Sequence, residues 1–328
     1  KPTTRQLRSS MYRYPKRTFL VVLPLLMMVF APSLNLPRAA VAQDPDIISQ
    51  TPIPTGTSNW SMQADGVTRT FRLYVPESLD QSAPSPLVVV MHGGMGSARN
   101  AERGYGWDAR AKASGFIVAY PDGLNRVWNA GNCCGKSQRN NIDDVGFITQ
   151  MVDAIGARLS IDTSRIFAAG MSNGAMMAYR LACESDMFAA IGPVSGTVLV
   201  SCDHPAPVSV IHIHGLADPN VRFDGEKGAG VGKVDGMPIP DVISLWQAVD
   251  QCDPAESTTE VLVTTAIAQC ANGRAVELIT IEGGGHHYPR PDARPKDGES
   301  AAKAKAAKAI DATATLWAFF ATHPKPAA

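Results

Sequence analysis

The sequence lacks any acidic residue before Asp44, so its charges are unevenly distributed. The whole chain is formally neutral, but seven of its 30 cations precede Asp44, which leaves 23 cations against 30 anions in the remainder. Phosphate binding needs a clustered positive face, and the remainder has none, so we expect no nucleic-acid partner. Charged residues make up only 18% of the sequence, below the roughly 25% of average proteins. Its 45% hydrophobic content is that of a globular chain and excludes a disordered or collagen-like protein.

A membrane-spanning run is also missing from the N-terminal segment. The apolar run from Phe19 to Ala31 contains Pro24 and falls short of the roughly 20 residues that cross a bilayer. A cationic stretch at 13–17 precedes it, and the small residues 40–42 follow it, which is the pattern of a cleaved export signal. We therefore expect residues 1–42 to be a signal peptide, with Met11 a possible start, and the mature chain to be secreted without stable membrane association. An uncleaved anchor is the alternative.

Zinc-like spacings and C-x-x-C motifs are absent, although the chain has six cysteines. In an oxidising compartment cysteines are expected to form disulfides. Many pairings are possible, and we expect Cys252 with Cys270, which flank a short polar-then-strand segment; the other candidates are Cys133, Cys134, Cys183 and Cys202. A metal cluster of His212 and His214 with Asp218 and the histidines at 286–287 is an alternative, but no ligand pair has zinc-site spacing on a helix. We expect no metal and no cofactor.

Composition divides the rest of the chain into three parts. Residues 43–60 are rich in Pro, Thr and Ser without periodicity, which predicts a flexible leader. Residues 61–323 contain no linker and no internal repeat, and their length suits one catalytic domain. Residues 324–328 are expected to be a tail.

Short apolar runs alternate with helix-like windows along this domain. The expected strands are 87–91, 116–120, 165–169, 208–213 and 276–281, and the expected helices are 143–159, 174–184, 238–250 and 301–321. This alternation predicts an α/β fold with a mostly parallel sheet and helices on both faces. Residues 69–75 alternate polar and apolar side chains and precede the series, so they fit an antiparallel edge strand.

The clearest chemical signal is Gly170-Met171-Ser172-Asn173-Gly174, between an expected strand and an expected helix. A strand-turn-helix setting with small residues around the serine is typical of a nucleophile elbow, in which the serine oxygen projects above the sheet. An ordinary strand-to-helix turn with a serine cap is the alternative. We predict that Ser172 is a nucleophile.

A serine nucleophile needs a base, and the base needs an acid that orients it. Asp218 and then His286 follow the serine in that order, each just past the end of an expected strand. Parallel sheets place their sites at that edge, so we predict a Ser172, His286 and Asp218 triad. His287 is a competitor for the base. Asp122, Asp143 and Asp144 are rival acids, of which the last two are better explained as helix caps.

Two further loops are candidates for substrate contacts. An oxyanion hole would take one backbone N–H from Asn173 and a second from the Gly-rich loop after residue 91, at Gly94 or at Met95. The loop beginning with Trp128 and Asn129 carries the vicinal Cys133 and Cys134. It could line a substrate pocket or serve as a disulfide-pinned structural loop.

Taken in order, these motifs resemble the secreted polyhydroxybutyrate depolymerase and feruloyl esterase family of α/β-hydrolases. The resemblance spans roughly residues 60–322 and rests on the following segments: 92–94, 115–123, 128–131, 133–135, 143–148, 170–175 and 283–286. It implies an α/β-hydrolase fold and a carboxylic-ester hydrolase with Ser172 as nucleophile, Asp218 as acid and His286 as base. The family's Trp-Pro after that histidine is Tyr288-Pro289 here, and His287 occupies the position between. These departures change the nearby pocket, for which His287 and Tyr288 are candidate residues.

The expected substrate is thus a polymeric or oligomeric ester, either a hydroxybutyrate polyester or a feruloyl or acetyl ester of plant polysaccharide. An acyltransferase on the same fold, a non-catalytic binding protein and a serine peptidase are the alternatives.

Overall fold

Ten strands form one mixed sheet in the computed structural model, which describes residues 53–80, 82–230, 232–294, 298 and 300–327. The strand order is β1-β2-β4-β3-β5-β6-β7-β10-β9-β8. The strands are β1 Gly56–Ala64, β2 Val67–Val75, β3 Ser85–Met91, β4 Ile117–Pro121, β5 Ile161–Met171, β6 Ala190–Val194, β7 Ser209–Gly215, β8 Glu256–Glu260, β9 Val263–Gln269 and β10 Ala275–Ile281. The strands from β4 through β10 in this order run parallel, and antiparallel pairs extend the sheet at both edges.

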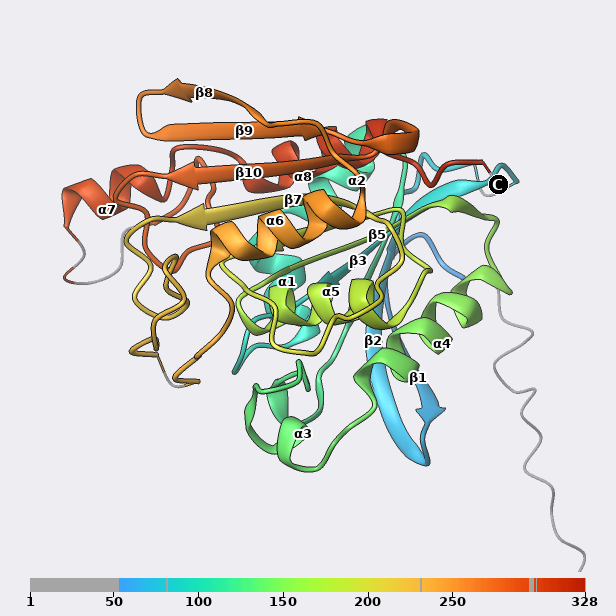
Figure 1. Cartoon of the computed structure of the whole chain (residues 1–328). Helices are drawn as coiled ribbons and strands as arrows, with labels where there is room; N and C mark the ends of the chain where they lie inside the picture. Colours follow the sequence, from blue (N-terminus) through green and yellow to red (C-terminus); the bar gives the residue numbers. More distant parts are fainter. Residues whose placement is uncertain (1–52, 81, 231, 295–297, 299, 328) are drawn as a thin grey trace, which may run out of the picture. The chain divides into compact units, whose positions relative to one another are not determined.

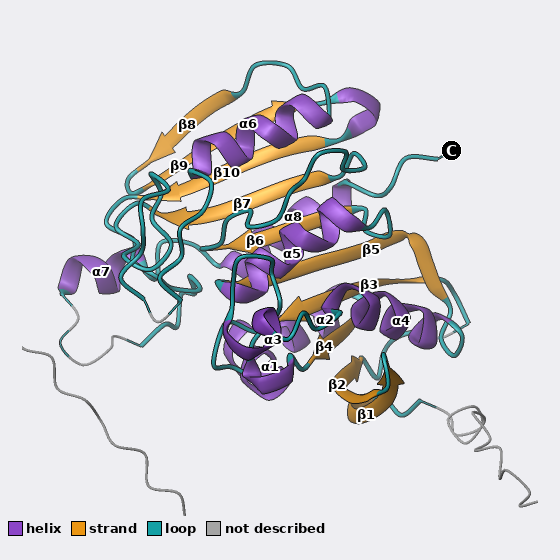
Figure 2. Ribbon diagram, turned by 60° about the horizontal axis from the view of Figure 1, so that its bottom comes forward, coloured by secondary structure: helices purple, strands orange, loops and turns teal. Residues whose placement is uncertain are grey.

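Helices cover both faces of the sheet (Figures 1 and 2). They are α1 Ala98–Tyr105, α2 Trp107–Ser114, α3 Gly135–Arg139, α4 Asp144–Gly156, α5 Asn173–Glu184, α6 Ile239–Val249, α7 Ala301–Ala306 and α8 Ala312–Thr322, with short 3-10 turns at Leu124–Arg126 and Ala271–Gly273. Side chains of α4, α5 and α6 form one apolar layer with the sheet, and those of α1, α2 and α8 form the other. This is the predicted α/β-hydrolase architecture, and each expected strand and helix of the parallel region is present.

The N-terminal edge differs from the prediction. The predicted signal peptide and the leader up to residue 52 lie outside the described residues. Residues 56–60, assigned to the leader, belong to β1, and the expected edge strand at 69–75 is β2, which lies between β1 and β4. The leader assignment followed composition and missed the alternating exposure of β1, whose Trp60 stacks on Phe71 with ring centroids 6.5 Å apart.

Three other parts of the chain also differ from the prediction. Central strand β6 was not predicted because Gly192 and Pro193 are poor strand formers, but a Cβ at position 192 would lie 2.8 Å from Leu316 of α8. The single helix expected at 301–321 is interrupted at 307–311, where Asp311 caps α8 by accepting from Ala314 N–H. The expected tail is anchored, because Lys325 donates to the main-chain oxygens of Ser164 and Asp186.

All six cysteines are paired: Cys133 with Cys134, Cys183 with Cys202, and Cys252 with Cys270. The predicted bond between Cys252 and Cys270 is confirmed. The described helices include none whose length and apolar character would let it cross a bilayer.

Candidate active site

Ser172 lies at the sharp turn between β5 and α5. Its backbone has φ 56° and ψ −121°, in a region that L-residues rarely adopt. The turn is tight enough that a Cβ at position 170 would lie 2.5 Å from the main chain of Gly174, so only glycine fits. The predicted strand-turn-helix setting of this serine is therefore present, and its strained geometry is that of a nucleophile elbow.

Two hydrogen bonds connect the serine to residues far away in the sequence. His286 Nε2 lies 2.9 Å from Ser172 Oγ, and His286 Nδ1 lies 2.7 Å from Asp218 Oδ2. Ser172 follows β5, Asp218 follows β7 and His286 follows β10, so the parallel strands deliver all three residues to one edge of the sheet. The structure thus brings together the three residues that the sequence predicts as a triad.

The acid and histidine loops touch through two glycines. A Cβ at Gly215 would lie 2.3 Å from the main-chain oxygen of Gly284. A larger residue at 215 would therefore push apart the loops that follow β7 and β10. Ala217 N–H also donates to Gly284 O at 2.8 Å. This close approach lets Asp218 reach His286 directly.

Asp218 is buried, and three hydrogen-bond donors hold its carboxylate. Oδ1 accepts from the N–H groups of Asn220 and Val221 at 2.8 and 3.0 Å, and Oδ2 faces His286. Burial alone would raise the pKa of Asp218, but the hydrogen bond and charge of His286 and the two backbone donors outweigh it, so the pKa is lowered. The carboxylate is therefore ionised and can stabilise a cationic imidazole. His214 Nε2 lies 3.9 Å from Oδ2, too far for a hydrogen bond.

The oxyanion prediction is corrected at one residue. Met95 N–H donates to Arg126 O at 2.8 Å, and the Arg126 guanidinium donates back to Met95 O, so Met95 is not available as a donor to a ligand. Gly94 N–H has no partner within the part of the chain that the structure describes. A Cβ at Gly94 would lie 3.8 Å from Asn173 Cβ, so Gly94 and Asn173 are neighbours at the start of α5. Sequence reasoning missed Arg126, which holds this loop in place.

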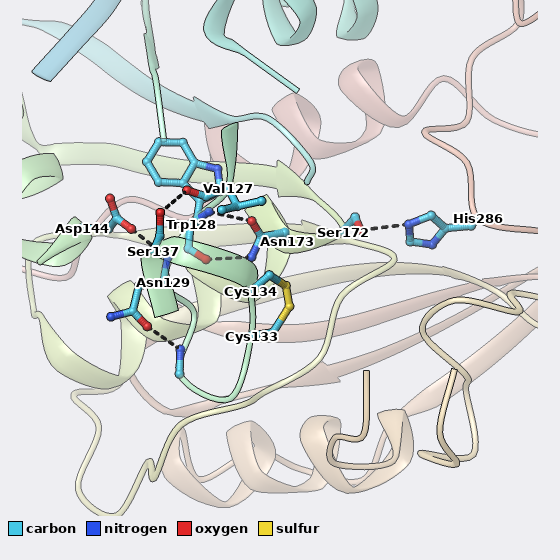
Figure 3. Close-up of a disulfide and its surroundings, with 11 residues drawn as sticks. Val127, Trp128, Asn129, Cys133, Cys134, Ser137, Asp144, Ser172, Asn173 and His286 are labelled. Atoms are coloured by element: carbon cyan, nitrogen blue, oxygen red, sulfur yellow. Dashed lines mark hydrogen bonds between the residues drawn. A yellow bond between two sulfur atoms is a disulfide. The ribbon is translucent and has the colours of Figure 1, made fainter. Parts of the chain in front are cut away.

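Trp128 and Asn129 do not line a pocket, contrary to one of the two predicted roles. Trp128 is fully buried and its indole N–H donates to His92 O at 2.9 Å. The amide of Asn173 exchanges two hydrogen bonds with the main chain of Trp128, at 2.7 and 3.1 Å. Figure 3 shows Asn173 between Ser172 and the loop that holds the Cys133–Cys134 bond. This loop is structural and ties the elbow to its surroundings.

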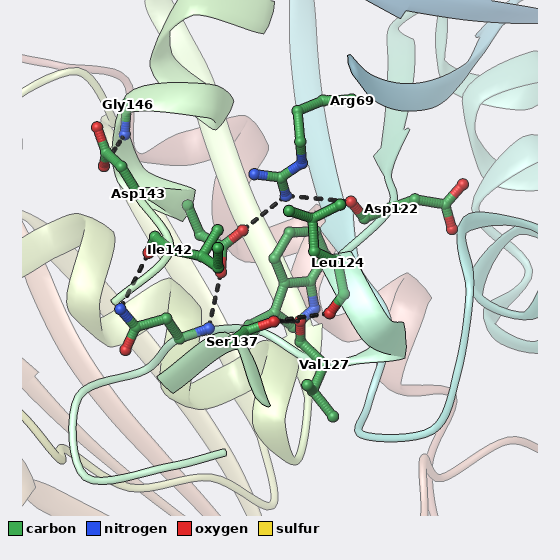
Figure 4. A network of polar contacts seen from close by, with 12 residues as sticks. Arg69, Asp122, Leu124, Val127, Ser137, Ile142, Asp143 and Gly146 are labelled. Atoms are coloured by element: carbon green, nitrogen blue, oxygen red, sulfur yellow. Dashed lines mark hydrogen bonds and ion pairs between the residues drawn. The ribbon is translucent and has the colours of Figure 1, made fainter. Parts of the chain in front are cut away.

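A second polar network supports the same loop (Figure 4). Asp144 accepts from Asn129 N–H at 2.7 Å and from Arg69 at 2.6 Å, and both charged side chains are buried. The prediction that Asp144 is a helix cap is therefore wrong, whereas Asp143 does cap α4 by accepting from Gly146 N–H. Nothing in the sequence pattern marks Arg69 as its partner, because the two residues are 75 positions apart.

The remaining candidates have other environments. Asp122 accepts from Ala98 N–H at 2.7 Å at the start of α1 and lies apart from the triad hydrogen bonds. His287 folds back over Gly285, where a Cβ would lie 2.9 Å from the imidazole. Tyr288, predicted as a pocket residue, stacks on Tyr105 with centroids 4.2 Å apart and pairs with Thr313, so its ring and hydroxyl serve packing between α1 and α8.

Within the described residues, no group of His, Cys, Asp and Glu side chains has a geometry that could hold a metal ion. His212 and His214, candidates for such a cluster, instead share a hydrogen bond of 2.9 Å between His212 Nε2 and His214 Nδ1.

Comparison with known proteins agrees with this fold. A family profile described as Esterase PHB depolymerase matches residues 69–263, more than half of the chain. The chain belongs to this family. It is a carboxylic-ester hydrolase with the α/β-hydrolase fold, as the sequence predicts.

Two curated relatives of this PHB depolymerase family member are esterases by name. "Putative esterase NocK" of Nocardia uniformis subsp. tsuyamanensis is 30% identical over 282 residues, which cover 79% of this chain and 82% of that protein. Feruloyl esterase C of Emericella nidulans is 33% identical over 165 residues, which cover 48% of this chain and 57% of that esterase. The second match therefore spans less than two thirds of its relative.

Among solved structures, an acetyl xylan esterase from Aspergillus awamori is similar with a TM-score of 0.54 and 18% identity, covering 70% of this chain and 94% of that one. At that identity the likeness concerns the fold alone.

Proposed function

We propose that the protein is an exported serine esterase in which Ser172, His286 and Asp218 form the catalytic triad. The observation that carries this proposal is the pair of hydrogen bonds from His286, at 2.9 Å to Ser172 Oγ and at 2.7 Å to Asp218 Oδ2. A serine hydroxyl becomes a nucleophile when a base within this distance takes its proton and an acid orients that base. Ser172 also lies at the elbow between β5 and α5, at the edge of the sheet where the parallel strands end, and this position supports the same role.

The mechanism follows from these contacts. Ser172 Oγ attacks the ester carbonyl carbon, and its proton moves to His286 Nε2, while the ionised Asp218 stabilises the imidazolium. The carbonyl oxygen becomes an oxyanion that accepts from the N–H groups of Gly94 and Asn173. The C–O bond to the alcohol then breaks as His286 returns the proton to the leaving oxygen. Water, deprotonated by His286, attacks the acyl-enzyme, and collapse of that intermediate releases the acid and restores Ser172.

The substrate class we propose is a polymeric or oligomeric ester: a hydroxybutyrate polyester, or a feruloyl or acetyl ester of plant polysaccharide. The family and the names of the relatives support these classes. Met95 and Leu216, in the oxyanion and acid loops, are large apolar side chains with 61% and 40% exposure. Exposed apolar groups beside a site suit contact with a polymer better than contact with a small hydrophilic ester.

Export is proposed from the N-terminal pattern described above and from the three disulfides, which persist in an oxidising compartment. Residues 1–42 would be removed, and the enzyme would meet its polymer outside the cytoplasm.

The test compares Ser172→Ala with wild type on p-nitrophenyl acetate, methyl ferulate, acetylated xylan and a hydroxybutyrate oligomer. Loss of a triad member is expected to lower kcat by at least about a thousandfold. Ser201→Ala is the matched control, because Ser201 is exposed and bonds only to Asp203 nearby. Equal hydrolysis by wild type and Ser172→Ala would refute the triad, and the preferred ester would identify the substrate class.

If folded wild-type protein hydrolyses nothing in the panel, the hydrolase proposal fails. Transfer of the acyl group to an added alcohol acceptor would then indicate the acyltransferase alternative.

A further inference from the structure

A continuous chain of hydrogen bonds runs from α5 through β7 to the acid loop. The Tyr179 hydroxyl lies 2.7 Å from His212 Nδ1, and His212 Nε2 lies 2.9 Å from His214 Nδ1. His214 Nε2 then lies 2.8 Å from Val221 O. All four residues are buried, with side-chain exposures of 0 or 1%. The proposed triad does not include Tyr179, His212 or His214.

The acceptor at the end of this series of hydrogen bonds, Val221 O, determines which nitrogen of each histidine carries the proton. A main-chain oxygen can only accept, so His214 Nε2 carries a hydrogen and the Nδ1 of a neutral His214 accepts. His212 Nε2 must then donate to it, which leaves His212 Nδ1 to accept from the Tyr179 hydroxyl. Neutral histidines therefore allow one direction for all three hydrogen bonds.

Both histidines are held neutral. Burial lowers the pKa of His212 well below its ordinary value and lowers the pKa of His214 as well. The titratable groups that face His214 are His212 on its own strand, Asp218 on the acid loop and His286 on the loop after β10. Of these, only Asp218 favours a charged His214, and its effect is smaller than that of burial.

The neutral state has a consequence for the acid. Val221 accepts from His214 through its oxygen and donates through its N–H to Asp218 Oδ1 at 3.0 Å. Asp218 Oδ2, which holds His286, is also 3.9 Å from His214 Nε2. A cationic His214 would carry a hydrogen on Nδ1 and lose the hydrogen bond that His212 donates to it, and an absent His214 would release Val221.

We propose that His214, oriented by His212 and Tyr179, is a positioning residue that holds the Val221 peptide and so keeps the Asp218 carboxylate directed at His286. This role rests on the proposed function, since it acts only through the triad. His214 does not touch the reacting atoms.

The test replaces His214 with Gln and with Leu. Gln offers a neutral N–H to Val221 O and an oxygen to His212 Nε2–H, whereas Leu fills the space with neither. His214→Leu is expected to lower kcat by up to about 100-fold with KM little changed, because the acid is misplaced while the substrate surface is intact. His214→Gln is expected to retain most of kcat. Equal kcat losses in the two variants, or full kcat in folded His214→Leu, would overturn the proposal.

A second measurement does not depend on the folding of variants or on catalysis. Nitrogen-15 histidine spectra of the wild-type protein should show His212 and His214 as neutral, Nε2-protonated tautomers from about pH 8 to about pH 5.5. Protonation of either ring in that range, or an Nδ1-protonated tautomer, would contradict the inference. These spectra stand even if Ser172→Ala were active, so failure of the inference and failure of the triad are distinguishable.

Discussion

Asp144 and Asp250 are both buried carboxylates beside an arginine, yet their environments differ. Asp144 contacts Arg69 at 2.6 Å and accepts from Asn129 N–H. Asp250 lies 3.8 Å from Arg274, and neither of its oxygens has a hydrogen-bond partner of ordinary geometry among the described residues. A buried charge needs close hydrogen-bond donors. Asp144 has them, whereas Asp250 has only a long ion pair.

Arg69→Met would remove the cation that pairs with Asp144. It should leave Asp144 buried without its cation, and breaking a buried pair typically costs about 3–5 kcal/mol. Denaturant unfolding measures the loss, and activity should fall as well because Asp144 holds the loop that Asn173 contacts. The double variant Arg69→Met/Asp144→Asn should recover much of the stability, since asparagine leaves no unpaired charge and keeps an oxygen for the Asn129 N–H. A single variant as stable as wild type would show that the pair is unimportant.

The disulfides offer a second test of the region around Asp250, because Cys252 lies two positions after it in the sequence. Replacing both cysteines with serine should cost about 3 kcal/mol by releasing a loop of 18 residues. Cys183–Cys202, with a separation of 19, is the matched control, for which chain entropy predicts almost the same loss. Melting temperatures of the two double variants would test this. A much larger loss at Cys252–Cys270 would mean that the bond also holds the strands around Asp250.

Asp250→Asn should have the smallest effect and the opposite sign. Burial raises the pKa of Asp250 to about 7, and the charge of Arg274 and the N–H of Val208 oppose it only in part. The folded state therefore binds a proton that the unfolded state has lost, so this carboxyl favours folding at low pH and destabilises the protein progressively as the pH rises toward 7. Asn removes the charge, so the variant should melt roughly 2–4 °C higher at pH 8, which corresponds to about 1 kcal/mol.

The control for this variant is the pH itself. Below about pH 3.5 Asp250 is mostly protonated in both the folded and the unfolded state, so the melting temperatures of the two proteins should converge there. A gain in stability of the same size at both pH values would point to packing instead of charge.

Local patterns predicted the parts of the molecule that local chemistry determines. The elbow, the strand ends that carry Asp218 and His286, and the helices around them follow from periodicity and turn residues. Strand β6 was missed because Gly192 serves a contact with α8 that no neighbouring residue reveals. The sequence left the role of the Trp128 loop open, because an aromatic residue in a loop suits a pocket as well as a core.

Long-range partners were beyond the reach of the sequence. Arg69 and Asp144, or Tyr179 and His212, meet only after the sheet has formed, and neither pair has a characteristic spacing. The Met95 assignment failed similarly, because the acceptor of its N–H belongs to Arg126, some 31 residues along the chain.

The outer strand β8 has a consequence for behaviour at high concentration. Every residue of Glu256–Glu260 is exposed, and the strand pairs only with β9 in the described sheet. If two molecules aligned these edges antiparallel about Thr258, each Glu256 would face a Glu260 of the other molecule. Like charges directly opposite destabilise a strand pair, so this edge repels its own copy. The acidic ends of β8 thus protect the enzyme from edge-to-edge aggregation.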